Sequence, residues 1–60
     1  MNNLELANQL IESLNIPFYV KHEQYILSYK ANNKMVVAFG STKEEVILNF
    51  HELYTNVFAY

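Results

Sequence analysis

The fold is decided by residues 35–57, which read MVVAFGSTKEEVILNFHELYTNV. The run opens with β-branched, apolar and aromatic residues that are typical of a strand, and the only glycine of the chain, Gly40, interrupts it. Ser41 and Thr42, each with a glutamate three residues later, then form two overlapping capping boxes that satisfy free backbone amides. We therefore expect a strand, a sharp turn at Gly40 and a helix.

The predicted C-terminal helix is amphipathic. At about 100° per residue, its apolar side chains fall on one stripe, and such a stripe needs an apolar partner. Leu48 falls outside the stripe among polar neighbours and predicts a second contact surface. The stripe itself comprises Val46, Ile47, Phe50, Leu53, Tyr54, Val57 and Phe58.

A second amphipathic helix is predicted near the N-terminus. Asn2 and Asn3 are favourable N-cap residues. Asn15 favours the left-handed conformation that ends helices, and Pro17 prevents continuation, so we expect the helix to end near Leu14. Its apolar stripe comprises Leu4, Ala7, Leu10, Ile11 and Leu14.

Two segments between the helices alternate between apolar and polar residues and predict strands over residues 16–22 and 25–31. Pro17 has no amide to donate, so the first of these strands should lie at an edge of the sheet or begin at Pro17. Asn32 and Asn33 tolerate positive φ and predict a tight hairpin before the third strand.

The register of that hairpin depends on the length of its loop, because a shift of one residue moves every side chain to the other face. A two-residue loop would pair Tyr29 with Val36 and mix a lysine into the apolar face. A three-residue loop opposes Lys30 and Lys34 instead, which costs up to about 1 kcal/mol at an exposed site and less than burying a lysine. We therefore favour the three-residue loop. The predicted core face is then Tyr25, Leu27, Tyr29, Met35, Val37 and Phe39, with Leu27 beside Val37.

The predicted fold class is α+β, with residues 1–60 forming a single small domain. The element order is α-β-β-β-α, and a three-stranded antiparallel meander packs against two helices. The sheet face away from the helices, together with the isolated leucine of the C-terminal helix, is the candidate partner-binding surface. Its residues are Tyr19, Lys21, Ile26, Lys30, Lys34, Val36 and Leu48.

Composition limits the classes of partner. The net charge is −2, and the chain contains no arginine, so long-range attraction and bidentate contacts to phosphate are both lacking. This weighs against nucleic acid as a partner. The apolar fraction of 52% is high for 60 residues, so we expect apolar surface that drives association as a homodimer or with a protein partner.

The sequence carries no signature of a membrane protein, because no apolar run reaches spanning length and the N-terminus lacks a basic signal-peptide region. We therefore expect a soluble, cytoplasmic protein. The chain has no cysteine and only two distant histidines, so neither a metal site nor another cofactor is expected.

Two groups of residues have side chains suited to a site: one to acid–base catalysis and one to stacking on nucleic-acid bases. His51, Glu52 and Tyr54 are the residue types of an acid–base site, but the helical period turns Tyr54 to the core and the other two to solvent, so we expect no enzyme. Tyr19 beside Lys21 resembles a base-stacking pair. An apolar contact with a protein is the interpretation that fits the negative net charge better.

Residues 40–50, GSTKEEVILNF, following a short meander, resemble the N-terminal domain of HicB-type antitoxins, whose helix follows a Gly-x-Thr-x-Glu-Glu-Ala-type start. The resemblance covers about half of the chain and implies a partner-binding domain. The element order is also similar to that of the double-stranded-RNA-binding domain. That family opens its last helix with a basic cluster, whereas here Glu44 and Glu45 follow Lys43 and would repel phosphate.

These observations predict a small, non-enzymatic, protein-binding or regulatory module, antitoxin-like or phage-borne, that acts by protein–protein association. The alternative is a weak nucleic-acid-binding domain that uses the lysines of the sheet face. A salt-sensitive interaction with DNA or RNA would distinguish the second from the first.

Overall fold

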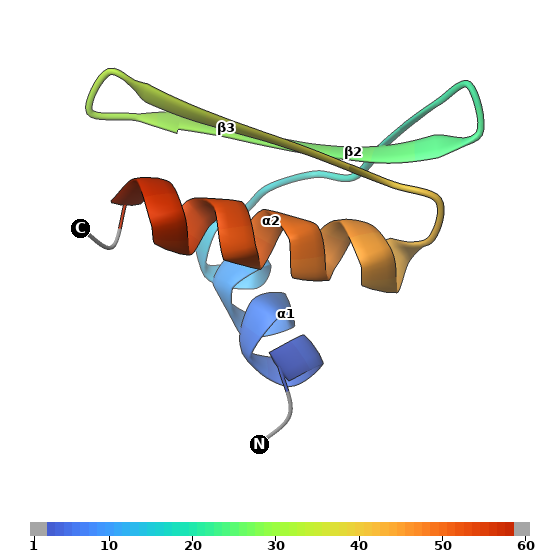
Figure 1. Ribbon diagram of the computed structural model, residues 1–60, viewed down its shortest axis with the longest axis horizontal. Helices are drawn as coiled ribbons and strands as arrows, with labels where there is room; N and C mark the ends of the chain where they lie inside the picture. Colours follow the sequence, from blue (N-terminus) through green and yellow to red (C-terminus); the bar gives the residue numbers. More distant parts are fainter. Residues whose placement is uncertain (1–2, 59–60) are drawn as a thin grey trace.

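The computed structural model describes residues 3–58 and has the predicted order α-β-β-β-α (Figure 1). The three strands form one antiparallel sheet in the order β1-β2-β3, and both helices lie on the same side of it (Figure 1). The predicted α+β class is therefore confirmed, whereas the predicted cap at Asn2 lies outside the described residues. The elements are α1 (Asn3–Leu14), β1 (Tyr19–Lys21), β2 (Gln24–Ala31), β3 (Lys34–Gly40) and α2 (Lys43–Phe58).

Helix α1 ends as predicted, at a left-handed asparagine. Asn15 has φ of 55°, and its N–H donates to the carbonyl of Glu12 at 3.1 Å. The N–H of Ile16 donates to the carbonyl of Ile11 at 3.3 Å, which completes a Schellman motif. Ile11 and Ile16 are both buried, so this cap directs the chain from the helix into the core.

Helix α2 begins after Thr42, the start of the second of the two predicted capping boxes. The Thr42 hydroxyl accepts the Glu45 N–H at 3.1 Å, and the Thr42 carbonyl accepts the Val46 N–H at 3.1 Å. Thr42 is thus the N-cap, because both its side chain and its backbone satisfy amides of the first turn. Ser41 is exposed just before the helix.

The first hairpin is shorter than predicted. β1 pairs with β2 only over Tyr19–Lys21, and Lys21 lies opposite Gln24, so His22 and Glu23 form a two-residue turn with φ of 52° and 62°. The expected strand over residues 16–22 was wrong at both ends. Pro17 has no amide for the ladder, and the chain before it is held by the cap of α1.

The second hairpin has a two-residue loop, so the predicted three-residue register was wrong. Tyr29 pairs with Val36, and Leu27 pairs with Ala38 instead of Val37. Asn32 and Asn33 have φ of 53° and 63°, which is the type I′ geometry whose twist matches that of the flanking strands.

The argument against this register was that it mixes Lys30 into the apolar side, but Lys30 and Lys34 are both exposed. Lys34 lies on the helix side of the sheet but is exposed, and its Nζ donates to the Val57 carbonyl at 3.3 Å. That carbonyl belongs to the last turn of α2, where the helix dipole favours a positive charge. Lys30 lies opposite Met35, so the expected Lys30–Lys34 pair does not form.

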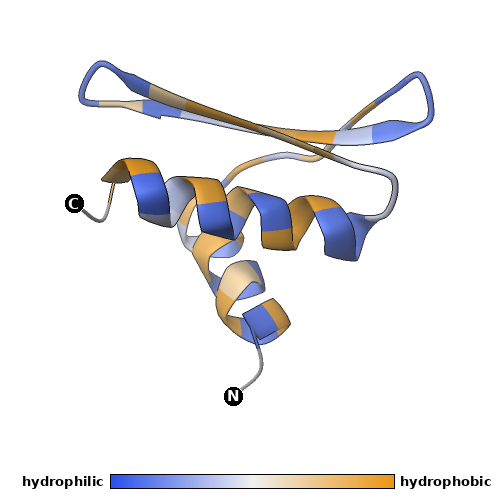
Figure 2. Cartoon of the chain, in the orientation of Figure 1, coloured by the Kyte–Doolittle hydropathy of each residue, from blue (hydrophilic) through white to orange (hydrophobic). Residues whose placement is uncertain are grey.

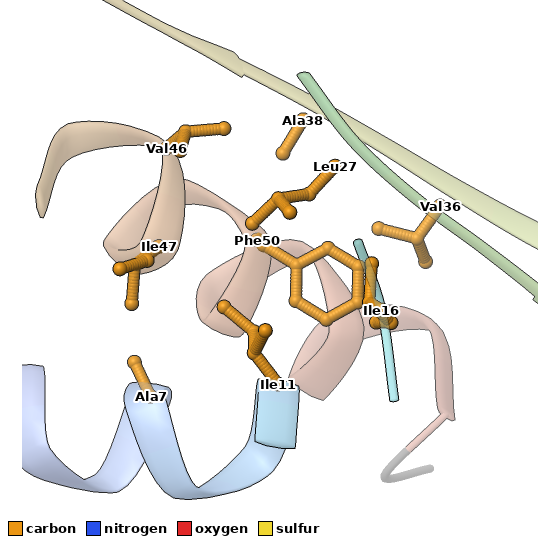
Figure 3. Close-up of a cluster of buried hydrophobic side chains, with 9 residues drawn as sticks. All are labelled: Ala7, Ile11, Ile16, Leu27, Val36, Ala38, Val46, Ile47 and Phe50. Carbon is orange, nitrogen blue, oxygen red and sulfur yellow. The ribbon is translucent and has the colours of Figure 1, made fainter. Parts of the chain in front are cut away.

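The core lies between the sheet and the two helices (Figure 3). Phe50 of α2 is fully buried at its centre, and Ala38 lies above it on the sheet. Two predictions are corrected here: Val36, expected on the open face, is buried, and Leu53, expected in the core stripe, is 39% exposed. The buried side chains are Ala7, Ile11, Ile16, Leu27, Val36, Ala38, Val46, Ile47 and Phe50.

Gly40 serves close packing and not the sharp turn that we expected. Its φ is not positive, so another residue could adopt the same backbone angles. A Cβ atom at this position, however, would lie 2.5 Å from the Val46 nitrogen and 2.9 Å from the Val46 Cα. The end of β3 therefore touches the backbone of α2 in a way that only glycine permits.

We expect Gly40→Ala to lower the free energy of unfolding by about 1 to 3 kcal/mol, because the added methyl group pushes β3 away from the backbone of α2. The neighbouring change Ser41→Ala is the control and should be nearly neutral, because Thr42 provides the cap. Chemical denaturation measures both variants. Equal stability of Gly40→Ala and the wild type would contradict the close-approach interpretation.

We expect Glu23→Gly to raise the free energy of unfolding by about 0.5 to 1 kcal/mol, because glycine adopts positive φ without the strain that a side chain brings. Gln24→Gly, one residue later within β2, should instead destabilise the protein, because glycine weakens a strand. Thermal unfolding monitored by circular dichroism compares the two. A lower melting temperature for Glu23→Gly would refute this expectation.

Candidate interaction surface

Neither helix covers the sheet face away from the core (Figure 1). The register aligns Tyr19, Ile26 and Phe39 in one row across the three strands. Alternation along β3 adds Val37 and Met35 to the same face. Tyr19, Phe39 and Met35 are 58%, 52% and 62% exposed. We call these five residues, Tyr19, Ile26, Met35, Val37 and Phe39, the open-face patch.

Two lysines border the open-face patch. Lys21 lies opposite Gln24 beside the first turn, and Lys30 lies opposite Met35 near the second, so the lysines are at opposite ends of β2. The three strands contain no aspartate or glutamate. The strands therefore place apolar side chains in the middle of this face and one lysine toward each end, with Glu23 in the turn beside Lys21. The ribbon is hydrophilic at both turns (Figure 2).

The other two lysines are engaged elsewhere. Lys34 contacts the end of α2, and the Nζ of Lys43 lies 5.5 Å from the centre of the Phe18 ring, a cation–π arrangement. Lys34 was predicted to lie on the open face, so that prediction was wrong. The two-residue loop is the reason, because it turns Lys34 to the helix side.

The structure brings together four of the predicted partner-binding residues, Tyr19, Lys21, Ile26 and Lys30, on the open face. Leu48 is separate, 40% exposed on α2. Met35, Val37 and Phe39 were missed because the wrong register assigned them to the core. The signal that identifies them is the Asn32-Asn33 dipeptide, which favours a two-residue type I′ turn.

A groove runs between the outer edge of β3 and helix α2. Its volume is about 330 Å³, and the Asn49 amide on its wall donates to the Phe39 carbonyl at 2.9 Å. Leu53 faces this groove, which explains why it is not part of the core. The lining residues are Val37, Ala38, Phe39, Asn49, Glu52 and Leu53.

A second hollow, of about 450 Å³, lies between the start of α1 and the outer face of α2. It brings His51 and Glu52 close to Leu48. Tyr54 lies elsewhere, in an aromatic cluster whose ring centres are 6.0 Å (Tyr29) and 5.0 Å (Phe58) from its own. The three residue types considered for acid–base chemistry therefore do not meet in one pocket. The lining residues are Asn3, Leu48, His51, Glu52, Thr55 and Asn56.

Residues 3–58 contain no buried polar or charged side chain and no cluster of three potential metal ligands among histidine, cysteine, aspartate and glutamate. Within the same range, neither helix combines the length and the apolar character needed to cross a bilayer. The described surface therefore offers two features for binding. One is the open-face patch with its bordering lysines, and the other is the outer edge of β3.

Comparison of the chain with family models, with curated proteins and with solved structures gives no match. The resemblances to HicB-type antitoxins and to the double-stranded-RNA-binding domain therefore stay predictions.

We expect Met35→Thr and Phe39→Thr each to change the free energy of unfolding by less than about 1 kcal/mol, because both side chains are largely exposed and threonine suits a strand. Leu27→Ala, on the opposite face of the same sheet, should cost about 2 to 5 kcal/mol because it leaves a cavity. Urea denaturation measures all three variants. A loss of several kcal/mol in Phe39→Thr would mean that the open-face patch is structural.

Proposed function

We propose that the protein is a non-enzymatic binding module that acts by covering an apolar surface with an acidic border on a protein partner. The open-face patch carries this proposal, because it is a contiguous apolar surface on a sheet face that no other element covers. Lys21 and Lys30 give the patch a charge preference, since no acidic side chain lies on the strands.

Binding of a partner requires both apolar contact with the open-face patch and pairing of its lysines with acidic groups. Burying the exposed halves of five side chains gains on the order of 5 kcal/mol. Association costs roughly 4 to 15 kcal/mol, so apolar contact alone does not hold a partner firmly. Pairing the two lysines with acidic groups adds affinity and orientation, while their aliphatic stems cover apolar surface.

A second copy of the chain fits this face less well than an acidic partner does. Two open-face patches placed face to face bring the lysines of both copies to the shared border, and the strands supply no acidic side chain to pair with them. The expected homodimer therefore remains a prediction, and its contact through this face should be weak and strengthened by salt, which screens the repulsion.

Nucleic acid is the alternative occupant, since Tyr19 and Phe39 are exposed aromatic rings on one row of the sheet. The net charge of −2 and the absence of arginine oppose it. The acidic protein partner is the better-supported choice.

The test is selection of peptides from a random display library on the immobilised protein, followed by affinity measurement of the selected peptides. We expect them to combine aromatic or aliphatic residues with aspartate or glutamate. Tyr19→Lys and Lys30→Glu should each weaken binding by about tenfold or more, because each removes a contact worth about 1.4 kcal/mol. Leu48→Lys is the matched control on α2 and should bind like the wild type.

Two results would overturn the proposal. One is a set of selected peptides that bind Tyr19→Lys as tightly as the wild type. The other is binding of a single-stranded oligonucleotide at physiological salt with a steep dependence on salt concentration, which would favour the nucleic-acid alternative.

A further inference from the structure

The outer edge of β3 has backbone groups that the sheet does not use. In a hairpin with a two-residue loop, the residues that flank the loop form a hydrogen-bonded pair, and every second pair along the strands does the same. Ala31 and Lys34 are that first pair, so Met35, Val37 and Phe39 direct their N–H and carbonyl groups away from β2. The contact between the Asn49 amide and the Phe39 carbonyl supports this assignment, because α2 could not reach a carbonyl that pointed into the sheet.

This edge lacks most of the devices that protect other edges from pairing. Natural sheets shield their edges with proline, bulges, inward charges or very short strands. β3 is seven residues long, contains no proline, and bears its only charge, Lys34, at its first position. The opposite edge is β1, which has only three residues and is therefore the poorer template.

We propose that the β3 edge binds an extended segment of a protein partner, which adds to the sheet as a fourth strand, antiparallel to β3, in the groove beside α2. The site uses backbone groups of β3, whereas the open-face patch uses side chains, so it does not depend on the function proposed above. Val37 supplies one donor and one acceptor to the added strand, and Met35 and Phe39 supply further donors. Leu53 then contacts the side chains of the segment that point toward α2, and Asn49 limits pairing near Gly40.

The occupant is a single strand and not a second copy of the chain. Helix α2 packs mainly against β3, and its Asn49 side chain donates to the outward-facing Phe39 carbonyl. The helix therefore lies directly under the free edge of β3. Paired strands are about 4.8 Å apart, whereas packed helices need about 8 to 10 Å. Two copies joined edge to edge would therefore bring their α2 helices into collision, and an extended peptide without a helix avoids it.

Apolarity defines the preferred segment. Leu53 is 39% exposed in the groove and favours apolar residues at the alternate positions that face α2. We therefore choose the capped pentapeptide Lys-Leu-Thr-Leu-Lys as the probe, with its threonine opposite Val37 and both leucines toward α2. Its terminal lysines then lie on the same side of the sheet as the side chains of Met35 and Phe39 and keep the peptide soluble.

The decisive experiment is titration of the labelled protein with this peptide, followed by nuclear magnetic resonance. The amides of Met35, Val37 and Phe39 should shift and become protected from hydrogen exchange. Methylating the threonine nitrogen of the peptide should weaken binding by about tenfold, because it removes the donor to the Val37 carbonyl. Methylating a leucine nitrogen is the matched control and should have little effect, because alternate amides point away from β3.

Side-chain variants provide an independent measurement. Leu53→Glu should abolish binding, whereas Leu48→Glu, on the same helix with nearly the same exposure, should leave it unchanged.

Several results would overturn the inference. These are the absence of binding at millimolar peptide, equal loss of affinity for both methylated peptides, and shifts confined to Tyr19 and Ile26. Protection of the Val37 amide that rises with protein concentration in the absence of peptide would also overturn it, because the edge would then take a second copy. None of these results bears on the acidic peptides selected by the open-face patch, so the two proposals fail separately.

Discussion

The two left-handed asparagines of the second hairpin determine which side of β3 meets the helices. With Asn32 and Asn33 forming the whole loop, Val36 and Ala38 turn to the core, and Met35, Val37 and Phe39, which alternate with them, turn to solvent. One more residue in the loop would exchange the two sets. The composition of the core, the open-face patch and the direction of the edge amides all follow from this turn.

On the helix side of β3, the side chains become smaller along the strand, from its start to its end at Gly40. Val36, Ala38 and Gly40 follow one another on that side, and at Gly40 a Cβ atom would meet the backbone of Val46. The taper lets the first turns of α2 approach the end of β3 closely, while the far end leaves room for the rings of Tyr29, Tyr54 and Phe58. The wedge-shaped space between sheet and helix is thus filled without a polar group in the core.

Because the helices cover one side of the sheet, its other face and the outer edge of β3 remain exposed. Five apolar side chains lie on the face, and the unpaired amides of β3 lie on the edge. The two surfaces offer different recognition, because side chains dominate the first and backbone groups the second. They share Met35, Val37 and Phe39, whose side chains belong to the face and whose backbone belongs to the edge, so an occupant of one surface lies next to an occupant of the other.

Local chemistry sufficed to predict the elements. Thr42 caps α2, Asn15 caps α1, and the order of strands follows from short connections, because each of these features depends on residues close together in the chain. The same holds for Tyr19, Lys21, Ile26 and Lys30, whose face was predicted from alternation alone. By itself, therefore, the sequence determined the element order, both caps and the β1–β2 half of the open face.

The tertiary structure decided the face of β3, which the Asn32-Asn33 dipeptide favours and the alternation argument had opposed. The two candidate registers differ by one loop residue, and the two-residue loop places Lys34 on the helix side of β3. The Lys34 ammonium donates a hydrogen bond to the Val57 carbonyl, 23 positions along the chain. Lys34 therefore lies on the helix side of the sheet without being buried. The contact of Gly40 with Val46 likewise exists only once β3 and α2 are packed. The alternation of apolar and polar residues along a strand cannot reveal these two contacts, because the residues become neighbours only when α2 has folded back along β3.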